Sequence, residues 1–237
     1  MVNSRLFWVT GASGGLGLAL VKQLLAKGHC VAASALRSEA LTSLATRYRR
    51  QLLIVPWLLT EDEEVTEAAR AVEERWGSLD TLIINAGTCD YLPPDVEARD
   101  LFRTIAYTNQ RATEWSLASA LPLLVKGRSP LVMSIFSHHS AIRADAPDPS
   151  RLLENSAVQW FREYRKSLSE LGIDLSLIAP QLPEAPVIRA RVVPEAWTAE
   201  TAARRIVEVM PRRHAELVLE VLDMDGLWPL GLVDTED

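Results

Sequence analysis

The sequence predicts an α/β fold in which a doubly wound, mostly parallel sheet of about seven strands lies between two layers of helices. Three observations support this prediction. Short runs of residues with the length of a strand alternate along the chain with longer amphipathic segments, as in strands joined by crossover helices. The runs are largely apolar, which is typical of strands buried on both faces. A glycine-rich turn, residues 10–17, joins the first run to the first amphipathic segment.

The strands are expected where short apolar runs stand between turn signals or helix signals. These runs cover residues 6–9, 30–35, 52–55, 79–84, 130–136, 173–179 and 216–222. We expect the last of them to be an edge strand.

The helices are expected between these strands, from the glycine turn to residue 27 and at 38–48, 60–76, 96–125, 152–171 and 198–210. Local signals mark several of their ends. Ser38 and Thr60 are N-cap residues, and four acidic residues that suit the positive end of a helix follow Thr60. Gly28 and Pro211 end their helices, because glycine suits the C-terminal turn and proline cannot continue a helix.

We expect a single domain over residues 1–237, because no internal repeat or linker interrupts this pattern. With 237 residues, of which 48% are hydrophobic and 24% charged, the chain can bury one large core. Two proline-rich stretches, 140–149 and 181–197, follow strand ends. Ligands bind at the carboxyl ends of the strands in such sheets, so we expect these stretches to border the pocket.

Composition and charge argue against several kinds of partner. The net charge of −6 repels nucleic acid, and the pairs Arg49-Arg50 and Arg212-Arg213 are interpreted as solvated helix ends. Two unpatterned cysteines predict neither a disulfide framework nor a metal site. No apolar run approaches the roughly 20 residues that span a bilayer. The first strand follows Met1 too closely for a signal peptide, so we expect a cytoplasmic protein with no membrane partner.

The main functional signal is the segment Thr10-Gly11-Ala12-Ser13-Gly14-Gly15-Leu16-Gly17. A strand that turns through glycines into a helix brings backbone N–H groups and the positive end of the helix dipole to one point. This arrangement suits a phosphate or pyrophosphate, so the segment predicts a nucleotide pocket. The alternative interpretation is that the glycines only form a tight turn.

Further motifs follow in order: a strand ending in Asn85-Ala86-Gly87, Asn109 within the long helix, and Ser137 just after a strand. Together with the Thr-Gly-x-x-x-Gly-x-Gly pattern from Thr10, they resemble the short-chain dehydrogenase/reductase family over nearly the whole chain. The resemblance implies a Rossmann-type fold, binding of NAD or NADP, and a homodimer or homotetramer often built from the two long helices. The cofactor-binding residues it implies are Gly11, Ser13, Gly15, Leu16, Gly17, Asn85, Ala86 and Gly87.

The catalytic residues that the resemblance implies are only partly present. In that family a serine orients the substrate carbonyl, a tyrosine donates the proton, a lysine four residues later lowers the tyrosine pKa, and an asparagine completes the proton relay. Ser137 and Asn109 match the serine and the asparagine. The tyrosine and lysine positions hold Ser150 and Glu154, and a one-residue shift in register gives Arg151 and Asn155.

These replacements change the chemistry of the site. An ammonium favours a phenolate, whereas a carboxylate about 4 Å away would oppose it by on the order of 4 kcal/mol at an effective dielectric constant of about 20. Ser150 offers no acidic proton at neutral pH unless a base activates it. Ordinary carbonyl reduction by this route is therefore predicted to be absent or very slow. Glu154 is either paired with a nearby arginine, Arg151 or Arg143, or acts as a replacement acid.

Two further positions concern the cofactor. Gln181 stands where the family has a glycine, which brings bulk to the nicotinamide site. Arg37 follows the second strand, where no acid is present to hold a ribose 2′-hydroxyl. We expect NADP(H) in preference to NAD(H), and the alternative is that Arg37 is only an exposed residue at the start of a helix.

Three hypotheses for the function stay open. The first is a protein that binds NAD(P)(H) but has lost standard oxidoreductase chemistry, and acts as a nucleotide-responsive binding protein or a noncatalytic relative. The second is an NADP(H)-dependent oxidoreductase with another proton donor, either His138, His139 or a water held by Glu154. The third is a structural or assembly protein with an empty cleft.

Overall fold

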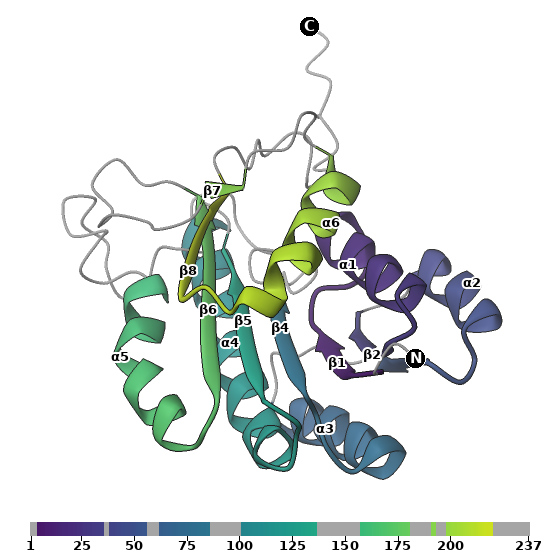
Figure 1. Ribbon diagram of the computed structural model, residues 1–237, viewed down its shortest axis with the longest axis horizontal. Coiled ribbons are helices and arrows are strands. Elements are labelled where there is room, and N and C mark those ends of the chain that lie inside the picture. Colours follow the sequence, from purple (N-terminus) through teal and green to yellow (C-terminus); the bar gives the residue numbers. More distant parts are fainter. Residues whose placement is uncertain are drawn as a thin grey trace, which may run out of the picture.

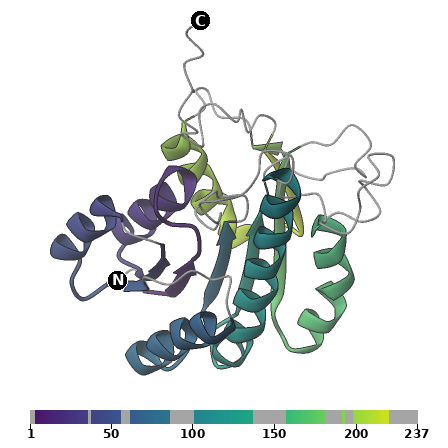
Figure 2. The same cartoon turned by 180° about the vertical axis from the view of Figure 1, so that it is seen from behind.

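The computed structural model describes residues 4–35, 38–55, 62–85, 101–136, 157–180, 191–192 and 198–219. These residues form an eight-stranded sheet with helices on both faces (Figures 1 and 2). The strands are β1 (Leu6–Val9), β2 (Cys30–Ser34), β3 (Leu52–Val55), β4 (Thr81–Asn85), β5 (Leu131–Ile135), β6 (Asp174–Pro180), β7 (Arg191–Val192) and β8 (Glu216–Leu219). The helices are α1 (Gly15–Ala26), α2 (Glu39–Arg47), α3 (Asp62–Trp76), α4 (Leu101–Val125), α5 (Ala157–Glu170) and α6 (Ala199–Val209), and a 3-10 turn, η2 (Met210–Arg212), follows α6.

The strand order is β3-β2-β1-β4-β5-β6-β8-β7, and every pairing between neighbours is parallel. The predicted doubly wound α/β fold is therefore confirmed. The order reverses between β1 and β4, so the chain leaves these two adjacent strands in opposite directions. A crevice at the carboxyl ends of such a strand pair is the usual ligand site of this architecture.

Alternate residues of the strands pack against different helical layers. Phe7 and Val9 belong to a core cluster with residues of α1, α2 and α6, whereas Trp8 between them belongs to a cluster with residues of α3, α4 and α5. Trp8 is fully buried, and its indole N–H donates to the Ser34 hydroxyl at 2.7 Å. The period of two along the strands thus divides the core into two halves and produces the three-layer arrangement.

The helix ends confirm the predicted cap at Ser38 and show another cap, at Thr198, that was not predicted. The hydroxyl of Ser38 accepts a hydrogen bond from the Leu41 N–H at 3.3 Å, and Thr198 caps α6 by accepting from the Thr201 N–H at 3.1 Å. The first residues predicted for two helices, 96–100 and 152–156, lie outside the described residues, as does Thr60. None of the described helices combines the length and apolar composition that crossing a bilayer requires.

Three details of the prediction are wrong. β8 is not an edge strand, because it lies between β6 and β7. The edge strand is β7, an eighth strand within the stretch 181–197 that we expected to be irregular. Two residues are too few to show the alternation of side chains that is typical of a strand. Only their pairing with β8 identifies them as one. Arg213 is not a solvated helix end, because its guanidinium donates to the Pro130 and Ser129 carbonyls and pairs with Asp174.

Candidate functional site

The glycine turn lies at the carboxyl end of β1, next to the reversal in strand order. Gly11 and Gly15 have φ angles of 60° and 49°, in the left-handed region that favours glycine. Gly17 is required for a different reason, since a Cβ there would stand 2.1 Å from the Gly11 carbonyl oxygen. Two glycines therefore shape the turn, and the third allows α1 to pack directly on it.

The amino end of α1 is free of described side chains. Gly14 is the N-cap residue, no side-chain cap is present, and the first turn contains no acid. A Cβ placed on Gly14 would have no heavy atom of the described residues within 4 Å. The first N–H groups of the helix and its dipole are therefore available to an anion.

Asn85, the last residue of β4, attaches that strand to the turn. Its backbone N–H donates to the Thr10 hydroxyl at 3.2 Å, and its side-chain Nδ2 donates to the Gly11 carbonyl at 3.1 Å. Asn85 is only 3% exposed, yet its Oδ1 accepts no hydrogen bond from the described part of the chain. Buried amide oxygens without a donor are uncommon, so Oδ1 marks a place where a donor from a ligand or a water fits.

The other flank of the turn is attached to β2 and α2. The Ala12 N–H donates to the Ser34 carbonyl at 3.0 Å, and the Ser38 hydroxyl donates to the Ser13 carbonyl at 3.0 Å. The turn is therefore held from both sides by hydrogen bonds within the chain. Leu16 is buried in the core beneath it.

The structure brings together the predicted cofactor residues of the turn, which are Gly11, Ser13, Gly15, Leu16 and Gly17, with Asn85. Asn109 lies within α4, of which only the backbone is described at this position. The remaining predicted site residues lie outside the described residues: Arg37, Ala86, Gly87, Ser137, His138, His139, Ser150, Glu154 and Gln181.

Tyr164 is the only tyrosine of α5, the helix that follows the predicted tyrosine position. Its side chain is exposed, and its ring centroid is 4.5 Å from that of Trp160. A phenol in this setting packs on the helix surface and is not enclosed with a substrate.

Two residues of the candidate site were missed by sequence reasoning. Thr10, which is 4% exposed, accepts the Asn85 N–H and so fixes β4 against the turn. Gly14 is the N-cap of α1, with no side chain over it. The predicted cofactor-binding residues included its neighbours Ser13 and Gly15 but not Gly14 itself. Both belong to the glycine motif, and the motif itself was the signal that could have identified them. Among the described residues, no group of three or more potential metal ligands gathers.

Comparisons with known proteins agree with this geometry. A sequence profile described as short chain dehydrogenase matches residues 5–146, which is more than half of the chain. The Short-chain dehydrogenase anuI of Penicillium roqueforti is 37% identical over 128 residues, covering 52% of this chain and 51% of that protein. The match therefore spans about half the length of this curated relative.

Two solved structures resemble the fold. A short-chain dehydrogenase from Streptomyces avermitilis has a TM-score of 0.65 and 21% identity, covering 92% of this chain and 89% of the other. RhlG from Pseudomonas aeruginosa, solved as an NADP active-site complex, has a TM-score of 0.58 and 26% identity, covering 74% and 72%.

Proposed function

The chain belongs to the short-chain dehydrogenase/reductase family, and from this premise we propose that it binds NADP(H) or NAD(H) but lacks the family's standard carbonyl/alcohol chemistry. One observation carries the second part: no tyrosine in the chain is followed four residues later by a lysine. The positions four residues after the tyrosines hold Leu52, Asp95, Arg111 and Leu168. The proton-donating pair of the family is therefore missing wherever the alignment register is placed.

The geometry of the glycine turn supports dinucleotide binding. Backbone N–H groups at the start of α1 would hold the pyrophosphate, because Gly14 leaves them uncovered. The buried Oδ1 of Asn85 offers an unused acceptor beside them. Arg37 would meet a 2′-phosphate, which favours NADP(H). When bound, the nicotinamide ring supplies a hydride donor or acceptor.

The remaining family residues could hold a carbonyl but would not protonate it. Ser137 and Asn109 can donate hydrogen bonds to an oxygen or a water, but neither is acidic at neutral pH. A positioned general acid contributes about 10²–10⁴-fold to such reactions. We therefore expect any turnover to be slower by about that factor than in a family member that has the tyrosine and lysine.

The binding half of the proposal is tested by calorimetric titration of NADPH and NADH into the wild type, Gly14→Ala and Arg37→Gln. Gly14 has an extended backbone, with φ −163°, and room for a Cβ, so Gly14→Ala should fold normally. Its methyl group would stand where a phosphate approaches, and we expect affinity for both dinucleotides to fall at least about tenfold. Arg37→Gln should weaken NADPH selectively. If wild type binds neither dinucleotide, the empty-cleft alternative replaces this proposal.

The chemical half is tested by turnover of a panel of aldehydes, ketones and alcohols. Wild type should show at most slow turnover, and a Ser150→Tyr/Glu154→Lys double variant should be faster if the two positions face the substrate. Ser150→Phe/Glu154→Met is the matched control, since it adds similar bulk without a proton donor. Rapid turnover by wild type, with a pH profile that changes in His138→Gln or His139→Gln, would establish the alternative donor instead.

A further inference from the structure

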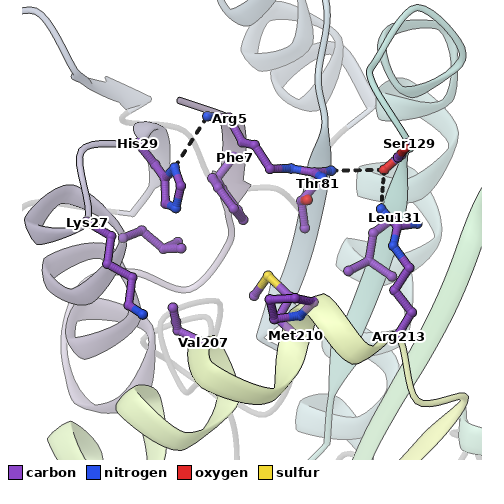
Figure 3. Close-up of a pocket in the computed structure, with 12 residues that line it drawn as sticks. Arg5, Phe7, Lys27, His29, Thr81, Ser129, Leu131, Val207, Met210 and Arg213 are labelled. Carbon is purple, nitrogen blue, oxygen red and sulfur yellow. Dashed lines mark hydrogen bonds between the residues drawn. The ribbon is translucent and has the colours of Figure 1, made fainter. Parts of the chain in front are cut away.

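A hollow lies at the amino ends of the strands, the opposite end of the sheet from the glycine turn (Figure 3). Its lining includes Arg5 just before β1, Thr81 at the start of β4, and Leu131 at the start of β5. The hollow has a volume of about 400 Å³, which lies within the range of small-molecule pockets. Because it stands at the other end of β1 and β4, it is separate from the dinucleotide site.

Much of the lining is apolar. Phe7 from β1 stands on one side, and Val207 from α6 and Met210 from η2 stand on the other (Figure 3). Leu24 from α1 also lines the hollow. All four side chains are buried in the core cluster that joins α1 to α6. The parts of these side chains that line the hollow make its wall apolar between the basic groups.

The charged residues that line the hollow, among those described, are all basic: Arg5, Lys27 and Arg213. Figure 3 shows Arg5 and Arg213 converging on Ser129, whose carbonyl accepts from Arg5 Nη2 at 2.9 Å and from Arg213 Nη2 at 2.6 Å. Two guanidinium groups thus share one neutral acceptor. Arg5 Nε is buried and has no partner in the described part of the chain. A donor and positive charge are therefore left for another group.

Nearby carboxylates offset this charge only in part. Asp80 pairs with Arg128 at 3.1 Å and also attracts the charge of Arg5, and Asp174 pairs with Arg213, so two carboxylates face four cations with Lys27 counted. Lys27 is exposed at the C-cap of α1 and makes no ion pair with a described residue. His29 lies on the same side as Lys27. Its Nδ1 accepts a hydrogen bond from the backbone N–H of Arg5 at 3.3 Å, and it contributes no negative charge. The net local charge is positive.

We propose that this hollow binds a small organic anion with an apolar body. The carboxylate or phosphate group would lie among the basic side chains that line the hollow, and the apolar body would lie against Phe7, Val207 and Met210. The combination of basic side chains, an unused buried N–H and apolar walls selects this class over neutral apolar molecules and over inorganic anions. The inference is independent of the proposed dinucleotide function, since it uses other residues at the other end of the sheet.

Four probes test this selectivity by calorimetry with the full chain: octanoate, octyl phosphate, neutral octanamide and inorganic phosphate. We expect octanoate or octyl phosphate to bind at least about tenfold more tightly than octanamide, the change expected for one charge-assisted hydrogen bond. The better of the two anions identifies the preferred headgroup. Inorganic phosphate should bind more weakly than both, because it lacks the apolar body.

Amide NMR spectra recorded during the same titration locate the site. Shifts should gather at Lys27, Gly28 and His29, and not in the glycine turn. Lys27→Gln should weaken the anions about tenfold and leave octanamide unchanged. Lys22→Gln is the matched control, since Lys22 is an exposed lysine of the same helix that does not line the hollow. Val207→Phe adds carbon to the hollow and should weaken both octanoate and octanamide.

Several results would overturn the inference. They are equal binding of octanoate and octanamide, shifts confined to the glycine turn, and anion binding that Lys27→Gln leaves unaltered. Lys27→Gln keeps the test decisive if Val207→Phe proves unstable, because an exposed lysine can be replaced without loss of the core. NADPH titrations of Lys27→Gln should match those of the wild type, which separates failure of this inference from failure of the proposed function.

Discussion

The two ends of the parallel strands are constructed from different groups. At the carboxyl ends of β1 and β4, the described contacts use backbone atoms and neutral side chains, chiefly those of Thr10, Asn85 and Ser38. At the amino ends, arginines hold the loops. Arg5 Nη2 alone donates to the carbonyls of Asp80, Arg128 and Ser129 at 3.2, 3.1 and 2.9 Å.

This difference separates the donors that hold loops in place from the donors that are available to a phosphate of a dinucleotide. Guanidinium groups at the amino ends satisfy loop carbonyls that would otherwise need water, so these donors stabilise the protein itself. The glycine turn leaves the first N–H groups of α1 without a described side-chain partner, so these donors are available to a phosphate. Substitutions at the two ends should therefore fail in different ways.

The largest expected effect is that of Asp80→Ala at the amino ends. Asp80 is 1% exposed and accepts from the Leu6 N–H at 3.0 Å, the Arg128 N–H at 2.7 Å and the Arg128 guanidinium at 3.1 Å. Its removal leaves buried donors unpaired and should lower the free energy of unfolding by about 4 kcal/mol, measured by urea denaturation at pH 7. Asp174→Ala, at a 56% exposed side chain, is the control and should cost less than about 1 kcal/mol. Similar losses in both variants would contradict the importance of burial here.

The second prediction contrasts two glycines of the turn. Gly17→Ala places a Cβ 2.1 Å from the Gly11 carbonyl oxygen, which is backbone and cannot swing aside. The free energy of unfolding should fall by about 3 kcal/mol. Gly14→Ala should change it by less than about 0.5 kcal/mol while it weakens dinucleotide binding. A stable Gly17→Ala variant would show that α1 can move away from the turn, and the separation of packing and binding roles would then be lost.

The third prediction concerns pH and the start of β8. Glu216 accepts two hydrogen bonds from Arg162, at 2.8 and 2.9 Å, and these lower the pKa of Glu216 although partial burial acts in the opposite direction. Because the folded pKa lies below the unfolded one, this stabilisation is present at neutral pH and is lost as pH falls through the folded pKa. We expect it to amount to about 1 kcal/mol. Denaturation curves from pH 7 to pH 3 should show a smaller decrease for Glu216→Gln than for the wild type, and parallel decreases would contradict the assignment.

The smallest expected effect is that of His29 beside the basic hollow. Burial is the main cause that lowers the pKa of His29, with the charges of Arg5 and Lys27 acting in the same direction. The folded protein therefore favours the neutral imidazole, and stability should decline by less than about 1 kcal/mol as pH falls below the unfolded pKa of about 6.5. His29→Phe keeps a ring against Phe7, 5.0 Å away in the wild type, and should remove this decline. A midpoint that does not change with pH between 8 and 5.5 in the wild type would rule out this contribution.

Much of the fold could be predicted because its signals are local. Each of the first six strands is a short apolar run, and Ser38 acts as the predicted cap. The glycine pattern predicted a phosphate turn because its spacing matches a strand, a turn and a helix. The predicted catalytic residues Ser137, Ser150 and Glu154 lie outside the described residues and stay predictions.

The sequence by itself determined the fold class, the glycine turn and the missing tyrosine–lysine pair, since each depends on residues that are neighbours along the chain. Only the tertiary structure decided the position of β8 inside the sheet, the attachment of Asn85 to Gly11, and the basic hollow. These features join segments that are far apart, such as Arg5, Ser129 and Arg213, and no local period or spacing encodes their contact. The physical reason is that hydrophobic alternation selects which face of an element is buried, whereas packing of the whole chain selects which side chains meet at its ends.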